Sequence, residues 1–310
     1  MTVIRSYIPK VCNITWHRLI LLHVMSTHKN ISGFIINITN TLVSLGKIAV
    51  KTRAWAKLPT SQGKHCLVLG NGPSLKAALA QKPEHFRNKS LICVNSFALS
   101  DDYVKLQPRY CVMLDPGLWK ANHDYIVNTM AALKEKTTWE FHLIIPHEAK
   151  ISDRIRSLSE NPNIKIHYFN YIVYKGFEGI GHYLFRKNLA MPQSQNVLVA
   201  SLFFAINLGY EKIEMFGADH NWHESLAVRE DNVVCVKQVH FYENENEVKY
   251  IPFYKPNSRQ ETFRMDEAFH AWAKVFYGYI RLRNYAESRG AKIYNATEKS
   301  FVDAFERISI

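Results

Sequence analysis

The sequence predicts an α/β fold built on a doubly wound, mostly parallel sheet. Short apolar runs recur along the chain, which is typical of strands buried on both faces. Segments of helical character alternate with these runs and indicate repeated βα units. The first unit is the clearest: residues 66–69 form an apolar run, residues 70–74 a glycine turn, and residues 75–81 a helix-compatible segment.

The later elements follow in chain order. A helix over 197–208 ends at Gly209, the usual residue at a helix C-terminus. A long helix over 266–289 ends at Gly290, and a short terminal helix is expected after the last strand. Residues 225–262 are expected to form a small lid insertion, because segment 243–259 combines polar residues with two prolines. The other strands are predicted at residues 90–94, 110–114, 141–145, 164–169, 212–216 and 292–294.

The positive charge of the chain is concentrated at its start. The net charge is +12 over 310 residues, and no Asp or Glu precedes Glu84. Residues 1–60 therefore form a basic N-terminal extension, and residues 61–310 are expected to form the catalytic domain. The apolar runs 19–24 and 33–50 are interrupted by polar residues and are too short to span a membrane. Basic amphipathic segments with Trp tend to lie at anionic membrane surfaces, so residues 1–57 are expected to do so. The alternative is a helical appendage that packs on the core or on another subunit.

The cysteines argue against a zinc site or a disulfide framework. The chain has five of them without a C-x-x-C spacing, and cysteine in a buried strand acts as a small apolar residue. This usage favours a reducing compartment.

The glycine turn predicts a nucleotide or phosphate site. Glycines let the backbone approach a ligand, and the following helix presents unpaired N–H groups to phosphate. The turn lacks the third glycine of the dinucleotide fingerprint, and the second strand ends at Asn95 where that fingerprint has an acid. An asparagine suits a base or sugar edge without adding charge. The alternative is an ordinary βα turn.

Ligands of doubly wound sheets bind beyond the carboxyl ends of the strands. The densest polar cluster there is DHNWHE, residues 219–224, which offers His220 and His223 as bases or phosphate donors. Zinc binding is disfavoured, because His220 and His223 have an H-x-x-H spacing that differs from that of zinc proteases. A magnesium-phosphate role for Asp219 is more plausible. The alternative for this cluster is a histidine-rich loop with a helix cap at Asp219. The alternative for Asp115 is a simple turn. His270 is expected to be a core histidine and the aromatic residues of its helix to be core, whereas His240 could reach the cleft.

Four segments carry a resemblance to known proteins: LVLGNGPSL, CVNSF, MLDPGLW and LGYEKIEMFGADH. They resemble the bacterial CMP-sialic-acid-dependent lipooligosaccharide sialyltransferases, and equally a broader MptE-like family. That family includes archaeal 6-hydroxymethylpterin diphosphokinases and the motility-associated factor proteins implicated in flagellin glycosylation. The resemblance covers roughly residues 65–305 and implies a Rossmann-like, GT-A-like sialyltransferase variant of the fold.

The resemblance also implies roles for individual residues. The nucleotide contacts of the sialyltransferases correspond to Asn71, Asn95 and, with a change from Asn to Asp, Asp115. The position of the tyrosine that assists the leaving phosphate falls on His220 or Asn221. The catalytic histidine of the family corresponds to His240 first and His223 second. The expected nucleotide and donor site comprises Gly70, Asn71, Gly72, Pro73, Ser74, Asn95, Ser96, Asp115, Ser194, Gln195, Asn196 and Asn221, and the expected catalytic set comprises Asp219, His220, His223 and His240.

These observations predict a glycosyltransferase that moves a nonulosonic or Kdo-like acid from a CMP-activated donor to a surface glycan. We expect it to be cytoplasmic and peripheral at the inner face of the bacterial plasma membrane, with a glycan acceptor that can be lipid-linked. A homo-oligomer stays open, no nucleic-acid partner is expected, and no cofactor is required. One alternative is diphosphate transfer from ATP to a pterin alcohol, with Mg²⁺ on Asp115 and Asp219. A non-catalytic nucleotide-binding scaffold is the other.

Overall fold

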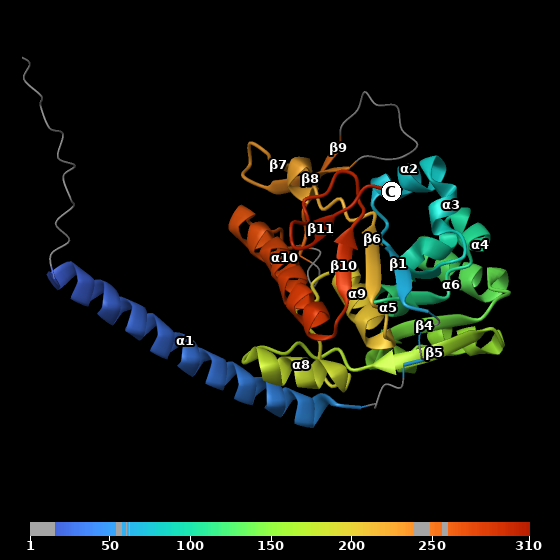
Figure 1. Ribbon diagram of the computed structural model, residues 1–310. Helices are drawn as coiled ribbons and strands as arrows, with labels where there is room; N and C mark the ends of the chain where they lie inside the picture. Colours follow the sequence, from blue (N-terminus) through green and yellow to red (C-terminus); the bar gives the residue numbers. More distant parts are fainter. Residues whose placement is uncertain (1–15, 54–57, 60, 62, 239–248, 256–259) are drawn as a thin grey trace, which may run out of the picture.

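The computed structural model describes residues 16–53, 58–59, 61, 63–238, 249–255 and 260–310, with the side chains of its first helix described from Ile31 onward. Its centre is an eight-stranded sheet of order β11-β10-β6-β1-β2-β3-β4-β5, in which all neighbours pair in parallel (Figure 1). The predicted doubly wound α/β sheet is confirmed. The strands are β1 (His65–Leu69), β2 (Ser90–Val94), β3 (Tyr110–Val112), β4 (Phe141–Pro146), β5 (Ile164–Phe169), β6 (Lys212–Phe216), β10 (Lys292–Asn295) and β11 (Glu306–Arg307).

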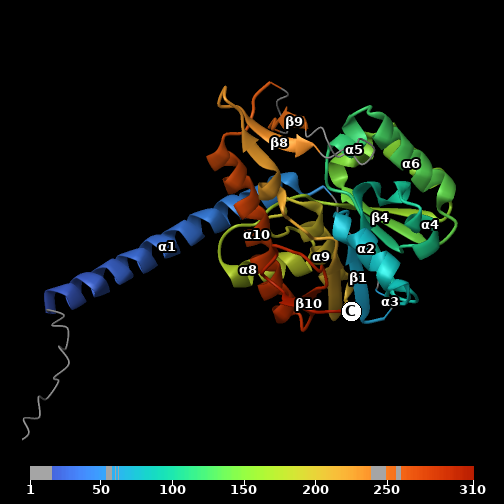
Figure 2. The same cartoon turned by 90° about the horizontal axis from the view of Figure 1, so that it is seen from above.

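Helices cover both faces of this sheet (Figure 2). Successive side chains of a strand point to opposite faces, so Cys66 and Val68 enter one core while Leu67 and Leu69 enter the other. One layer is formed by α8 (Glu178–Arg186), α9 (Val197–Leu208) and α10 (Met265–Ser288). The other is formed by α2 (Pro73–Gln81), α3 (Pro83–Phe86), α4 (Asp102–Leu106), α5 (Gly117–Lys120), α6 (Asp124–Lys136) and α7 (Asp153–Ser157). Single 3₁₀ turns lie at Asn95–Leu99, His147–Ile151, Leu158–Glu160 and Trp222–Ser225.

The end of the chain differs from the prediction. A short terminal helix was expected, but the chain runs extended and forms the two-residue strand β11. The reason lies in the apolar residues of the segment, which reach both cores. Val302 and Phe305 pack in the core under α9 and α10, whereas Ile308 and Ile310 pack against the core under α2. A helix could not place these side chains on both faces of a sheet edge.

The order of the strands reverses beside β1. Strands β1 to β5 succeed one another in one direction, and β6 then returns to the free side of β1. The connection after β1 leads to α2 on one face, and the connection after β6 leads to α10 on the other. Such a reversal opens a crevice at the carboxyl ends of the two strands, where doubly wound folds bind their ligands.

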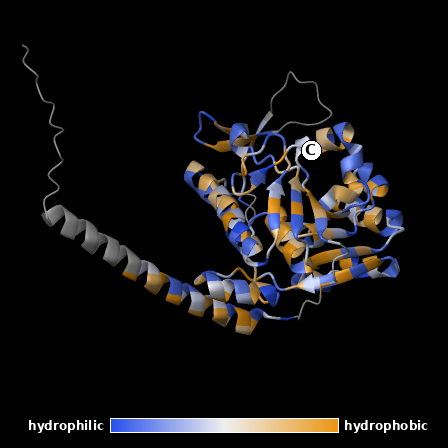
Figure 3. Ribbon diagram, in the orientation of Figure 1, coloured by the Kyte–Doolittle hydropathy of each residue, from blue (hydrophilic) through white to orange (hydrophobic). Residues whose placement is uncertain are grey.

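Within the N-terminal extension, residues Trp16–Lys51 form one long helix, α1, that reaches away from the rest of the molecule (Figure 1). Its last part is attached to the segment before α8. The hydroxyls of Thr41 and Tyr174 lie 3.1 Å apart, Ser44 Oγ donates to the carbonyl of Lys175 at 3.0 Å, and Ile48 is buried. Most apolar side chains between residues 31 and 45 remain exposed, and the ribbon of this part of α1 has orange, hydrophobic stretches in Figure 3.

The expectation that this extension is too interrupted to span a membrane is wrong on length and composition. Residues Ile31–Lys51 form a continuous helical stretch of 21 residues that contains an 18-residue window with a mean hydropathy of 1.4, so it is long and apolar enough to cross a bilayer. Asn, Thr and Ser interrupt the apolar sequence without interrupting the helix. Length and composition alone do not distinguish a spanning helix from one that lies on a membrane or packs on a partner.

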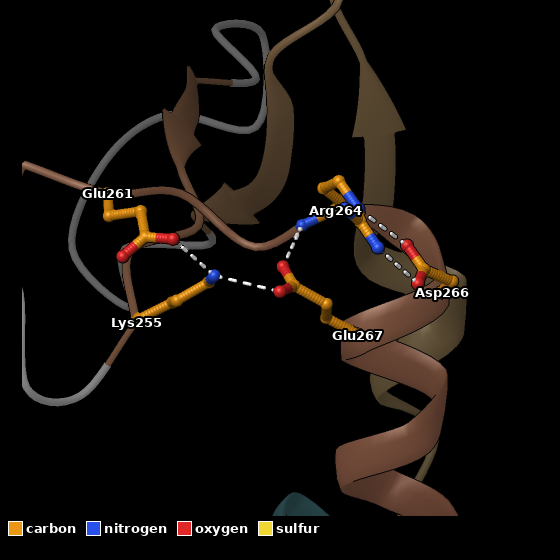
Figure 4. A network of polar contacts seen from close by, with 5 residues as sticks. All are labelled: Lys255, Glu261, Arg264, Asp266 and Glu267. Carbon is orange, nitrogen blue, oxygen red and sulfur yellow. Dashed lines mark hydrogen bonds and ion pairs between the residues drawn. The ribbon is translucent and has the colours of Figure 1, made fainter.

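The lid insertion contains a small antiparallel sheet. Its strands are β7 (Leu226–Val228), β8 (Val234–Gln238) and β9 (Lys249–Pro252), in that order, so part of segment 243–259 is regular structure after all. An ion-pair network ties the segment after β9 to the start of α10 (Figure 4). Lys255 Nζ lies 2.5 Å from Glu261 and 2.9 Å from Glu267, whose other carboxylate oxygen accepts from the Arg264 amide. Residues 239–248, which include His240, lie outside the described residues.

Candidate functional site

Most of the predicted site residues that the structure describes follow strand ends at one edge of the sheet. Strands β6, β1, β2 and β3 are neighbours in that order, and their carboxyl ends lie at the same edge. Residues far apart in the sequence follow these ends, and the N-terminus of α9 reaches the same place, because Asn196 contacts His220. The residues are Gly70–Ser74 after β1, Asn95 and Ser96 after β2, Asp115 after β3, and Asp219–His223 after β6.

Glycines allow the loops after β1 and β6 to touch each other. The amide of Gly70 donates to Phe216 O at 2.8 Å, and that of Gly72 donates to Gly217 O at 3.1 Å. A Cβ on Gly217 would lie 2.4 Å from Gly70 O, and one on Gly72 would lie 2.5 Å from Gly217 O. The glycines of the turn are therefore required for contact between two loops of the chain, which is a different reason from the predicted approach to a nucleotide.

The carboxylate of Asp219 lies at the start of α2. Ser74 Oγ donates to Asp219 Oδ2 at 2.8 Å, and a Cβ on Gly72, the N-cap residue, would lie 2.0 Å from the same oxygen. Gly72 supplies no side-chain cap, and Pro73 occupies the first turn. A negative group is stabilised at this positive helix end. A carboxylate of the chain thus lies where the sequence predicted phosphate, and Asp219 is bonded to the first turn of a distant helix through Ser74.

Ser74→Ala is expected to lower the free energy of unfolding by about 1 kcal/mol, because it leaves the Asp219 carboxylate without this partly buried donor. Urea denaturation would measure the change. The control is Ser159→Ala, which removes an exposed hydroxyl bonded to the Arg156 carbonyl and should stay within about 0.5 kcal/mol of the parent. Equal stability of the two variants would contradict a stabilising bond between Ser74 and Asp219.

His220 is held with its Nε2 atom pointing into the protein. That atom lies 3.1 Å from Asn196 Nδ2 and 2.8 Å from the hydroxyl of Tyr279. The orientation of the Asn196 amide is fixed, since its Oδ1 accepts from the Leu198 amide as the N-cap of α9. The Nδ2 group can only donate, so His220 Nε2 accepts and the neutral ring carries its proton on Nδ1.

Burial keeps His220 uncharged. Its side chain stacks on Trp222 with ring centroids 4.3 Å apart, and the residue is 6% exposed. Desolvation lowers the pKa of His220 to about 4. Burial raises the pKa of Tyr279, whose hydroxyl therefore stays protonated and can donate to His220. The backbone of His220 has a φ of +54°, a left-handed conformation that is uncommon outside glycine.

Next to His220 the loop is exposed. The ring of His223 meets Phe301 edge-on at 4.5 Å, and Asn221 Nδ2 donates to Glu224 at 2.8 Å. His223 is thus the exposed histidine of this loop within the described residues. His240, the first candidate for the base, cannot be placed.

The residues after β2 and β3 differ in their surroundings. Asn71 Nδ2 donates to the Val94 carbonyl at 3.3 Å, which links the loops after β1 and β2. Asn95 has a left-handed backbone with φ +48°, and its buried Oδ1 has no hydrogen-bond partner among the described residues. Ser96 follows it and is half-buried. Asp115 is exposed and accepts from the Gly117 amide at 2.8 Å, so it does form the turn that was its alternative role.

The loop before α9 is anchored by residues that the sequence did not assign to the site. Tyr171 donates to the carbonyl of buried Ser194 at 2.7 Å, while Gln195 is exposed. Tyr279 holds His220, although the spacing of aromatic residues on its helix predicted only core packing. A hydroxyl on a buried aromatic ring gives no separate signal in a sequence. The prediction from helical spacing was also wrong for His270 and Tyr277. Both were expected in the core, and both are exposed.

A cavity of about 310 Å³ flanks this edge, between α2, the ends of β6 and β10, and the last residues of the chain. Ser74 is the one predicted site residue among the residues that line this cavity. Gly217, from the adjoining loop after β6, lines it as well. Throughout the part of the chain that the structure describes, no three His, Cys, Asp or Glu side chains are grouped so as to hold a metal ion.

Comparisons with known proteins assign the chain to no family. No family model matches the sequence, and no curated protein matches it. One similar solved structure is a MAf glycosyltransferase from Magnetospirillum magneticum AMB-1, with 13% identity and a TM-score of 0.47. The similarity covers 87% of this chain and 38% of that protein, so the chain spans well under half of its length. A similarity this low carries no argument about function.

Proposed function

We propose that this chain is a glycosyltransferase that moves a nonulosonic or Kdo-like acid from a CMP-activated donor to a surface glycan. The observation that carries the proposal is the buried side-chain oxygen of Asn95. This residue follows β2, the strand next to β1, where the strand order reverses. Its side-chain oxygen is buried without a hydrogen-bond partner among the described residues, and a bound ligand would supply that partner. An amide oxygen suits the exocyclic amine of cytosine.

The neighbouring side chains support a donor site at this edge. Asn71 is tied to the end of β2, one residue before Asn95, and Asn196 opens α9. Amides recognise a base or sugar edge without placing negative charge beside the phosphate of the donor. The segments that carry the sequence resemblance, GNGPS, CVNSF, MLDPG and GADH, follow the four neighbouring strands β1, β2, β3 and β6.

The reaction would proceed by direct displacement. A histidine takes the proton of an acceptor hydroxyl as the oxygen attacks the anomeric carbon, while the bond from that carbon to the phosphate oxygen breaks and CMP leaves with the electron pair. His223 is the exposed histidine of the described loop, and His240 stays the other candidate. His220 has its Nε2 engaged by Asn196 and Tyr279, and in this arrangement it positions the loop.

Residues 1–57 would hold the enzyme at the inner face of the plasma membrane. The described part of α1 exposes apolar side chains such as Phe34, Ile35 and Leu42, and the basic residues Lys47, Lys51 and Arg53 stand near its end. The alternative of diphosphate transfer has no comparable support. Its Mg²⁺ would rest on Asp115 and Asp219, whose carboxylates accept hydrogen bonds from the Gly117 amide and from Ser74 Oγ.

Thermal melting with CMP, CDP, UDP, GDP or ATP, each with and without Mg²⁺, tests the proposal. CMP is expected to raise the Tm most, and to do so without Mg²⁺. A ligand at 100 times its Kd stabilises the folded protein by about 2.7 kcal/mol, so the nucleotide that binds most tightly gives the largest shift. Asn95→Ala is expected to abolish this shift.

The matched control is Asn88→Ala. Asn88 also has a left-handed backbone, with φ +56°, but lies at the opposite end of β2. Both substitutions impose the same backbone strain, so both should lower the Tm alike, and only Asn95→Ala should lose the response to CMP. A Tm shift with CMP that remains in Asn95→Ala, or a larger Tm shift of the parent with ATP and Mg²⁺, would contradict the proposal.

A further inference from the structure

A second cavity lies where α1 joins the rest of the molecule. Its volume is about 650 Å³, and it is bounded by α1, the segment before α8, the loop before α9 and the outer face of α10. The sequence motifs do not include it. The side chains that matter for its chemistry are Asn40, Lys175, Gln193, His270, Lys274 and Arg281.

The cavity is lined by three cationic side chains and one acid. Lys175, Lys274 and Arg281 line it, and none of them forms an ion pair within the described residues. Its acid, Glu178, is engaged by His182 at 3.5 Å and by Asn284 Nδ2 at 2.9 Å. Converging Lys and Arg side chains are the groups that bind phosphate oxygens.

Helical spacing places these groups on one face of α10. His270, Lys274 and Arg281 follow one another at intervals of four and seven residues, which brings them to the same side of a helix. Val275, Tyr279 and Leu282 occupy the opposite side, which packs on the sheet. The basic face is therefore directed away from the core and toward α1.

The wall formed by α1 connects the cavity to an apolar surface. Asn37 and Asn40 line the cavity, whereas Phe34, Ile38 and Leu42 on the same helix are exposed. A lipid whose chains lie beside such apolar side chains would have its head group next to the cavity. Basic pockets beside membrane helices on the cytoplasmic side bind anionic head groups in this way.

The opposite wall connects the cavity to the donor edge, which is the edge of the sheet where the loops after β1, β2, β3 and β6 lie. Gln193 lines it, and the close approach of α10 holds this residue, since a Cβ on Gly278 would lie 2.2 Å from Gln193 O. Three residues later Asn196 contacts His220. The loop before α9 therefore spans the distance between the cavity and the proposed donor site.

We infer that this cavity binds the phosphate of a membrane-borne lipid that carries the acceptor glycan. The inference rests on the proposed transfer function and gives its acceptor a chemical class, a lipid-linked phosphate. The cations hold the phosphate, α1 lies along the lipid, and the attached sugar extends past Gln193 toward the donor.

Vesicle binding of the full chain tests this inference. The probes are phosphatidylcholine vesicles that contain phosphatidic acid, which presents a lipid phosphate, or phosphatidylserine at equal molar fraction. The parent protein is expected to prefer phosphatidic acid. Lys274→Gln/Arg281→Gln is expected to weaken binding to phosphatidic acid about 30-fold, because each of the two cations contributes roughly fivefold, and to remove the preference.

The control is Lys120→Gln/Lys136→Gln, which removes the same charge from exposed positions on α5 and α6, across the sheet from the cavity. It should keep the preference for phosphatidic acid. Equal losses in both double variants, or an unchanged preference in the cavity variant, would overturn the inference. Displacement of the protein from phosphatidic acid by inorganic phosphate at the same molar concentration would indicate a site for soluble phosphate, and would also overturn it.

Melting with CMP separates this inference from the proposed function. The cavity variant is expected to keep the full CMP shift, because none of its changed residues touches the donor edge. A parent protein without any CMP shift would defeat the transfer function and with it the role of the lipid as acceptor, while the vesicle result would still report whether the cavity binds lipid phosphate.

Discussion

Gly217→Ala is expected to lower the free energy of unfolding by about 2–5 kcal/mol. Two costs add up, because Gly217 has a left-handed backbone with φ +64° and its new Cβ would lie 2.4 Å from Gly70 O. The left-handed conformation costs roughly 1–2 kcal/mol for a residue with a Cβ, and overpacking costs about 1–3 kcal/mol. The obstructing atom is a backbone carbonyl that belongs to the end of β1, so it cannot rotate away. Urea denaturation followed by circular dichroism would measure the loss.

The matched control for this substitution is Gly179→Ala in α8. No atom lies within 4 Å of the position of its new Cβ, and alanine favours a helix over glycine by up to about 1 kcal/mol. The control should be as stable as the parent or more stable. If Gly217→Ala unfolded at the same urea concentration as Gly179→Ala, the loops after β1 and β6 could not be in contact as described.

Acidification from pH 6.5 to 4 is expected to destabilise the protein, and His220 to account for about 3 kcal/mol of the loss. The pKa of His220 is lowered to about 4 in the folded state from 6.5. Between these values the unfolded chain binds a proton that the folded protein does not, so stability falls as the pH falls. Each unit of pKa difference corresponds to 1.36 kcal/mol. His142, whose pKa burial also lowers to about 4, adds a similar dependence.

His220→Gln isolates the contribution of His220. A glutamine oxygen can still accept from Tyr279 and Asn196 but does not titrate. The variant is expected to show a shallower fall of stability between pH 6.5 and 4, by about one bound proton, while the slope from His142 remains. Parallel profiles of parent and variant would mean that His220 is accessible to protons and is not buried as described.

The sheet could be predicted from the sequence because its strands are buried on both faces. Residues 90–94, 164–169 and 212–216 form strands with the predicted bounds. The final strand was missed, since Phe305 and Ile308 pack on opposite faces and no local pattern shows which side of a sheet a residue reaches.

The common edge at which the candidate residues lie could be predicted, but their contacts could not. Parallel strands end at a common edge, so Asn95 and Asp219 were expected there from their places after apolar runs. The bond between Ser74 and Asp219 joins residues 145 positions apart, and no local signal shows such a pair. The burial of His220 and the exposure of His270 depend on how α10 is rotated about its axis, which a stripe containing both aromatic and basic residues leaves undefined.

The place of β1 in the sheet has a consequence for synthesis. The ribosome makes this strand first of the eight, yet β1 lies between β2 and β6. Its second partner emerges roughly 150 residues later, which takes roughly 7–30 s at cellular rates of translation. During that interval one backbone edge of an apolar strand stays open to pairing with other chains. Nascent chains that stall before Lys212 should therefore aggregate or occupy chaperones, and those that pass Phe216 should close the sheet.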